Sequence, residues 1–207
     1  MHLLQADIGA QIFNYGGLLL ACLIVYASTG FFFAFFVPSG AVLFSAGVLA
    51  ATGAIPHNIY VVSLALTLAS IAGSWTGYLF GRSIGPRLYQ RKDSAFFKKQ
   101  HLYSAEAVYK KYGVWATSIS FFLPIVRSFS PVIAGIGKLS FLRFNLGATL
   151  GSFCWIVSFV GVGYFIGMRP EIKPYLGYIV TAFICLVTIP VVIRIIRSLR
   201  KASSESR

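Results

Sequence analysis

Arg127 is the residue of this 207-residue chain whose type and position point most clearly to chemistry. It is the only charged side chain inside an apolar block, about 114–137, and away from its ends. An arginine in an apolar membrane segment is costly, so by default it marks function. Pro124 and Pro131 flank it and expose backbone groups, and a guanidinium beside free N–H groups suits phosphate. The structural alternative is an arginine that snorkels to the membrane surface or pairs with backbone carbonyls.

The other ionisable residues form no recognisable catalytic set. The chain has no HExxH motif, no carboxylate pair within an apolar block and no nucleophile–base pair at a familiar spacing. The acids lie at block ends or in loops: Asp7, Asp93, Glu106, Glu171 and Glu205. His57, the one histidine near the broken apolar blocks, is interpreted as a solvated loop residue. We therefore predict that the protein is not an enzyme and needs no metal or other cofactor.

The composition indicates a membrane protein. Hydrophobic residues make up 57% of the chain and the mean hydropathy is +0.77, whereas soluble domains are about 45–50% apolar. No Asp, Glu, Lys or Arg occurs from Ile8 to Gly81, and a soluble fold would expose such a run to water. The net charge of +13 comes from basic clusters that flank apolar spans. The positive-inside rule explains these clusters better than nucleic-acid binding.

Two apolar blocks are interrupted in a way that predicts re-entrant hairpins. The first, about 30–51, contains Pro38-Ser39-Gly40, which an uninterrupted helix would not carry. The second, about 114–137, contains Pro124 and Pro131 and is bounded by basic residues on both sides. Irregular backbone at membrane depth is tolerated where protein shields it or where it lines a cavity.

The intact apolar stretches predict the membrane-spanning helices, and the basic segments predict their orientation. The expected spans are 12–26, 59–80 ending at Gly81-Arg82, 144–167 and 175–193. The basic segment 82–111 and the basic C-terminal tail 194–207 are assigned to the cytoplasm. Counting back through the spans also places the N-terminus in the cytoplasm. These features predict a multi-pass protein of a bacterial inner membrane, formed by one domain over 1–207.

The two halves of the chain share landmarks in the same order. Phe-Phe-x-Pro occurs at 35–38 and 121–124, and Gly-Tyr-x-x-Gly occurs at 77–81 and 163–167, each pair 86 residues apart. Chance matching in a chain rich in glycine and phenylalanine is the alternative explanation. If the repeat is real, the two hairpins enter from opposite faces, and such broken segments point to a transport site at the membrane midplane.

Glycines and tryptophans add predictions about packing. The four-residue spacing of Gly73, Gly77 and Gly81 allows close helix contact. Gly147 and Gly151 repeat that spacing in the second half. The three tryptophans are interpreted either as interface anchors or as packing within the bundle: Trp75, Trp115 and Trp155.

Together these landmarks resemble the DedA family of bacterial inner-membrane proteins, also called SNARE-associated or VTT-domain proteins. The resemblance covers about Ile8 to Arg200. Four stretches carry it: Phe35-Phe36-Val37-Pro38-Ser39-Gly40 with Ser45-Ala46-Gly47, Gly77-Tyr78-Leu79-Phe80-Gly81-Arg82-Ser83-Ile84-Gly85, Phe122-Leu123-Pro124-Ile125-Val126-Arg127-Ser128-Phe129-Ser130-Pro131 with Ala134-Gly135, and Phe144-Asn145 with Gly147-Ala148. The resemblance implies two opposed re-entrant hairpins and a protein that moves undecaprenyl phosphate or phospholipid between leaflets, often with dependence on the proton gradient.

This sequence departs from the family pattern at the acidic positions. Ser28 stands where relatives usually have a glutamate, Ser39-Gly40 where they have an acid after the hairpin proline, and Ser74 where an aspartate is common. Of two arginines flanking the second hairpin proline, the first is Phe121 here and only Arg127 remains. The groups expected to couple transport to protons are therefore absent.

The sequence thus predicts an all-α integral membrane protein, a polytopic bundle with two opposed re-entrant hairpins in an inverted repeat. It would move an anionic lipid, polyprenyl phosphate or phospholipid, with passive and coupled movement both open. The alternative is a non-transporting assembly or homeostasis factor that keeps the fold. A homo-oligomer is possible, and nucleic acid is not expected as a partner. The predicted substrate-binding residues are Arg127, Pro124, Pro131, Pro38, Ser39, Gly40, Ser28 and Ser74.

Overall fold

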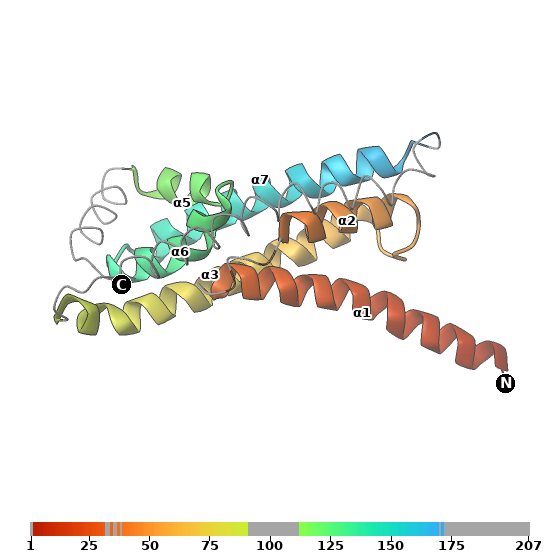
Figure 1. Cartoon of the computed structure of the whole chain (residues 1–207), viewed down its shortest axis with the longest axis horizontal. Coiled ribbons are helices and arrows are strands. Elements are labelled where there is room, and N and C mark those ends of the chain that lie inside the picture. Colours follow the sequence, from red (N-terminus) through yellow and green to blue (C-terminus); the bar gives the residue numbers. More distant parts are fainter. Residues whose placement is uncertain are drawn as a thin grey trace, which may run out of the picture.

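The computed structural model describes residues 2–31, 34, 37, 39–90, 112–169 and 171, and all regular structure in these ranges is helical. Side chains are described for 16–31, 34, 37, 39–85, 112–123, 126–169 and 171. The predicted last span and most of the basic segment 82–111 lie outside these ranges. Figure 1 labels the helices α1 His2–Gly30, α2 Ser39–Ala51, α3 Ile59–Gln90, α5 Val114–Ser120, α6 Pro124–Ile136 and α7 Phe141–Gly167.

Both predicted interruptions are confirmed. α1 ends at Gly30 and α2 begins at Ser39, so the first break spans the segment that contains Pro38. α5 ends at Ser120 and α6 begins at Pro124, where proline is favoured because the first helical residue needs no N–H partner. That these helix pairs are re-entrant hairpins stays a prediction.

Two details of the predicted helix boundaries are wrong. Pro131 lies inside α6 and does not break it; it removes one N–H from the helix ladder, and its side chain packs against Gly77 of α3. α3 does not end at Gly81-Arg82 but continues to Gln90. A change from apolar to polar sequence marks the end of the apolar stretch, not the end of the helix, and Gly85 still packs on α6.

Close backbone contacts at glycines join several pairs of helices. α1 packs on α3, where a Cβ at Gly30 would lie 2.9 Å from the carbonyl oxygen of Gly73. α5 packs on α7, where a Cβ at Gly151 would lie 2.8 Å from the carbonyl oxygen of Ser118. The predicted role of the spaced glycines in close helix contact is confirmed at these positions.

The short helices α2 and α6 pack across the two halves of the chain. α2 lies along α7, and α6 lies along α3. Figure 1 shows α2 beside the part of α7 that ends at Gly167, whereas α5 and α6 lie toward the opposite end of the long axis. Each half of the chain therefore supplies a short helix to the long helix of the other half.

The bundle is apolar on its outside and carries many hydroxyl groups inside. Large apolar side chains are exposed on the long helices, among them Leu64 and Leu68 of α3 and Phe153 and Phe165 of α7. The described part of the chain buries the following hydroxyl residues: Ser28, Thr29, Ser39, Thr67, Ser70, Ser74, Thr117, Ser120, Ser128, Ser130 and Ser152. Segments Ile59–Gly85 and Phe141–Gly167 are long and apolar enough to cross a bilayer.

Candidate functional site

Arg127 lies in the first turn of α6 and is buried, with 5% of its surface exposed. Its Nη2 donates hydrogen bonds to Ser28 Oγ of α1, at 3.1 Å, and to Ser39 Oγ of α2, at 2.5 Å. A residue of the second half thus binds two residues of the first half. The arginine neither snorkels nor pairs with a backbone carbonyl in the described part of the chain.

The guanidinium also has an aromatic neighbour and a buried donor without a partner in the described part of the chain. Its carbon Cζ lies 4.1 Å from the centre of the Trp155 ring, which is the geometry of a cation–π contact. Its Nε is buried and has no hydrogen-bond partner among the residues that the structure describes. Within this part of the chain, only neutral groups contact the positive charge.

Two helix N-termini meet at this charge. Ser39 is the first residue of α2, and Arg127 is the fourth residue of α6. The first N–H groups of a helix have no partner within the helix and carry the positive end of its dipole. Ser128 Oγ donates to the backbone carbonyl of Ser28 at 2.8 Å, so the last turn of α1 also reaches the cluster and the negative end of its dipole partly offsets the two N-termini. The buried positive charge of Arg127 itself is what favours an anion.

Of the predicted site residues, three meet directly and the others take different places. Arg127, Ser28 and Ser39 form the cluster. Gly40 follows Ser39 in α2, and a Cβ there would lie 3.1 Å from the Phe159 ring of α7. Ser74 is buried in α3, where its hydroxyl donates to the carbonyl of Ser70 at 2.9 Å.

Two of the three predicted prolines lie in the described helix α6, outside the cluster of Arg127, Ser28 and Ser39. Pro124 is at the N-terminus of α6, three residues before Arg127. Pro131 is buried between α6 and α3. Pro38 lies outside the described residues.

Trp155 is the site residue that the sequence did not identify. It is 3% exposed and contacts both Arg127 and Phe159, whose ring centre is 5.7 Å away. By contrast, Trp115 is 68% exposed, and Trp75, 42% exposed, donates to Asn145 Oδ1 at 2.7 Å. Trp155 lies near the middle of the predicted span 144–167, away from either membrane interface. This position was the available sequence signal that it contacts other side chains inside the bundle.

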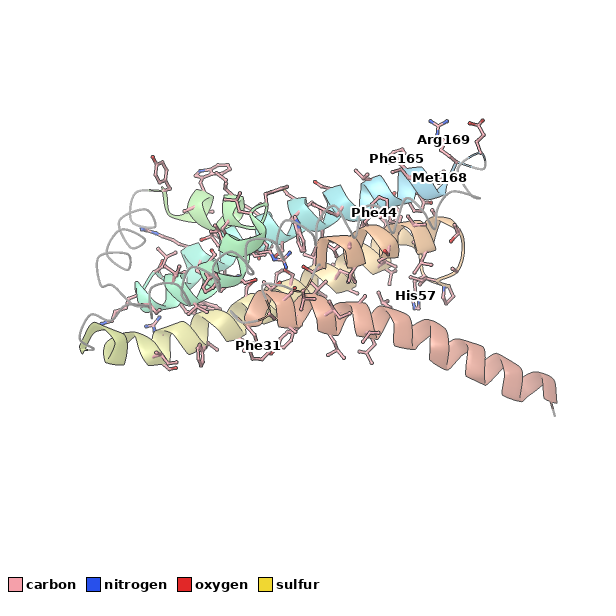
Figure 2. All side chains as sticks on the ribbon, viewed as in Figure 1. Phe31, Phe44, His57, Phe165, Met168 and Arg169 are labelled. Carbon is pink, nitrogen blue, oxygen red and sulfur yellow. The ribbon has the colours of Figure 1, made fainter. Side chains whose placement is uncertain are left out.

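His57 does not belong to this cluster. It lies between α2 and α3 and is partly buried. Figure 2 shows His57, Met168 and Arg169 toward the same end of the molecule, whereas Phe31, just after α1, lies far from them. His57, which follows α2, and Met168 and Arg169, which follow α7, therefore lie toward the same end of the molecule.

The comparisons with known proteins find one matching family and several membrane-protein relatives. The VTT domain matches residues 37–165. Protein DedA of Escherichia coli is 31% identical over 185 residues, 89% of this chain and 84% of that protein. A membrane protein of Mycobacterium tuberculosis is 33% identical over 183 residues, 87% and 80% of the two chains. Inner membrane protein YqjA of Escherichia coli is 28% identical over 170 residues, 82% and 75% of the two chains.

No solved structure matches the chain. The helical bundle with its apolar exterior and the named relatives define a membrane protein. The match to the VTT domain and the identity with Protein DedA show that the chain belongs to the DedA family.

Proposed function

We propose that this protein moves an anionic lipid, undecaprenyl phosphate or a phospholipid, between the membrane leaflets, with the headgroup phosphate bound at Arg127. The observation that carries the proposal is a buried guanidinium with neutral neighbours and an unused Nε donor, where two helices begin. A guanidinium presents forked N–H groups that match phosphate oxygens.

The electrostatics of the cluster favour a bound anion. Ser28 and Ser39 accept hydrogen bonds from Arg127 but do not neutralise its charge. A buried charge without a counter-charge is destabilising, and an anionic headgroup would supply one. The lipid chains could remain against the apolar outer face of the bundle, where residues such as Leu64 and Phe153 are exposed.

The cross-packed short helices support an inverted repeat of two re-entrant hairpins. The equivalent glycines of the two Gly-Tyr-x-x-Gly landmarks contact the short helix of the other half. Cβ atoms at Gly163 and Gly167 would meet Phe44 and Val48 of α2, and Cβ atoms at Gly77 and Gly81 would meet Pro131 and Val132 of α6. This correspondence supports true repetition over chance matching. Opposed hairpins would place Arg127 where a headgroup is reachable from both leaflets.

The charges at one end of the bundle support the proposed orientation. Arg82 Nη1 donates to the Tyr78 hydroxyl, which itself donates to the carbonyl of Leu139, so Arg82 and the turn before α7 lie together. Exposed Lys138 and Arg143 flank that turn. We assign this end and the basic C-terminal tail to the cytoplasm. In Figure 1 the beginning of α1 lies toward the opposite end of the long axis, which does not support the predicted cytoplasmic N-terminus.

Serine hydroxyls do not ionise near neutral pH, so Ser28, Ser39 and Ser74 would not couple transport to a proton gradient. Lipid movement is therefore expected without a pH gradient. The experiment is still run with and without a pH gradient, because a rate of lipid movement that depends on the gradient would indicate a titratable group elsewhere in the protein.

The test is transbilayer movement of labelled polyprenyl phosphate and labelled phospholipid in liposomes that carry the purified protein, with and without a pH gradient. We expect Arg127→Ala to abolish movement in folded protein. Arg143→Ala is the matched control, because it removes an exposed arginine from α7. No movement by folded wild-type protein would favour the assembly-factor alternative, and undiminished movement by Arg127→Ala would exclude Arg127 as the headgroup site.

A further inference from the structure

We propose that Trp155 positions Arg127 for anion binding, by covering one face of the guanidinium so that a phosphate group binds in the guanidinium plane, at the Nε edge. This inference rests on the proposed function and assigns to α7 a part in recognition. It concerns phosphate as a chemical group, carried by a lipid or free in solution.

The first step is which parts of the guanidinium are occupied. The Trp155 ring, 4.1 Å from Cζ, occupies one face. Nη2 is engaged by Ser28 and Ser39. Nε is the buried donor that has no partner in the described part of the chain. A phosphate at the Nε edge would accept its first hydrogen bond from Nε and its second from Nη2, where it would replace one of the two serines.

The second step is what holds the Trp155 ring. Phe159 lies one helical turn further along α7 and packs against Trp155, with ring centres 5.7 Å apart. Phe159 in turn lies against Gly40, where a Cβ would be 3.1 Å from the ring. The first turn of α2 therefore supplies both a hydrogen-bond acceptor, Ser39, and the space for the aromatic pair.

The third step separates positioning from simple packing. A tryptophan that only fills the core would affect the amount and stability of folded protein. A tryptophan that orients Arg127 would change the affinity for phosphate, and its own fluorescence would report ligand binding. A cation–π contact at a desolvated site corresponds to an effect of about 2- to 30-fold on binding.

The spectroscopic experiment uses Trp75→Phe/Trp115→Phe protein, in which Trp155 is the single tryptophan. Its emission is titrated in detergent with inorganic phosphate and, separately, with a short-chain polyprenyl monophosphate. We expect a saturable change with the lipid phosphate that is lost when Arg127→Gln is added. A similar change with inorganic phosphate would assign recognition to the phosphate group, and a change with lipid only would show that the chain is also required.

The matching functional experiment measures the half-saturating concentration of the same lipid for transbilayer movement. Trp155→Leu should raise it by about 2- to 30-fold, and Trp155→Phe, which keeps an aromatic face, should restore part of the loss. Trp115→Leu is the control for loss of an exposed tryptophan. If Trp155→Leu does not fold, Gly40→Ala displaces the same rings more mildly, with Gly161→Ala as its control because nothing lies within 4 Å of a Cβ there.

The inference is overturned if Trp155 emission ignores both probes and the Trp155 or Gly40 variant keeps the wild-type half-saturating concentration. If Arg127→Ala still abolishes movement in that case, the proposed function stands without this role for Trp155. If Arg127→Ala moves lipid normally, the proposed function itself is wrong.

Discussion

Replacing Ser39 with aspartate would place a carboxylate directly beside the buried guanidinium, and this single change should stabilise the protein while it impairs lipid movement. Ser39 Oγ already accepts from Arg127 Nη2 at 2.5 Å, so an aspartate at this position reaches the same donor. Ser39 is also the first residue of α2, where a negative charge is favoured by the helix dipole. The expected effects on stability and on transport therefore have opposite signs.

The magnitude follows from the separation of the charges. Two unit charges about 4 Å apart attract by about 4 kcal/mol at an effective dielectric constant of about 20. Part of this is lost to desolvation of the carboxylate, which leaves about 1–3 kcal/mol of additional free energy of unfolding. A phosphate that binds Arg127 must displace this carboxylate, so the half-saturating lipid concentration should rise by about 5- to 150-fold.

The assays are thermal unfolding in detergent and lipid movement in liposomes at several pH values. Ser39→Asn is the matched control, since it has nearly the shape of aspartate without the charge. Ser39→Asp should move lipid better as the pH falls and the carboxylate takes up a proton, whereas Ser39→Asn should show no such trend. If Ser39→Asp keeps wild-type half-saturation at neutral pH, Arg127 does not bind the headgroup and the electrostatic reasoning is refuted.

Two further predictions concern the helix contacts and the orientation. Gly135→Ala should destabilise the protein by about 1–3 kcal/mol, because its Cβ would overlap the carbonyl oxygen of Tyr78; thermal unfolding compares it with Gly161→Ala, where nothing lies within 4 Å and no such loss is expected. In a cysteine-free background, Asn58→Cys should react with an impermeant maleimide added outside cells, and Lys138→Cys only after the inner face is exposed. Labelling from the opposite sides would reverse the proposed topology.

The helices and their interruptions were predictable because they depend on local sequence. Long apolar runs form helices in a bilayer. A continuous helix would not carry Pro38, so a break before Ser39 was predictable. Helix ends were less predictable. α3 continues nine residues past Gly81 because hydrogen bonding within a helix does not depend on whether its side chains are apolar. Pro131 remains helical because its neighbours keep their own backbone bonds.

The cluster itself was predictable only in part. Arg127 stood out because charge is rare in apolar segments, and Ser28 and Ser39 were identified through the family resemblance. Which of these residues meet depends on how the halves pack, and no local pattern encodes that. Ser74 is buried but bonds within its own helix. From the sequence, Trp155 could be interpreted either as a packing residue or as an interface anchor. In a chain rich in aromatic residues, the sequence does not show which of them lies beside Arg127.

The cross-packing of the short helices explains why the site can exist at all. Arg127 belongs to α6, which lies on α3, and Ser39 belongs to α2, which lies on α7. Their N-termini therefore approach each other only when both halves are assembled, and Trp155 of α7 completes the cluster from the same helix that carries α2. A change that loosens one glycine contact, such as that between Gly47 and Val160, should thus alter the geometry at Arg127 without touching it. Within this fold, the recognition of an anion and the packing of the two halves depend on the same contacts.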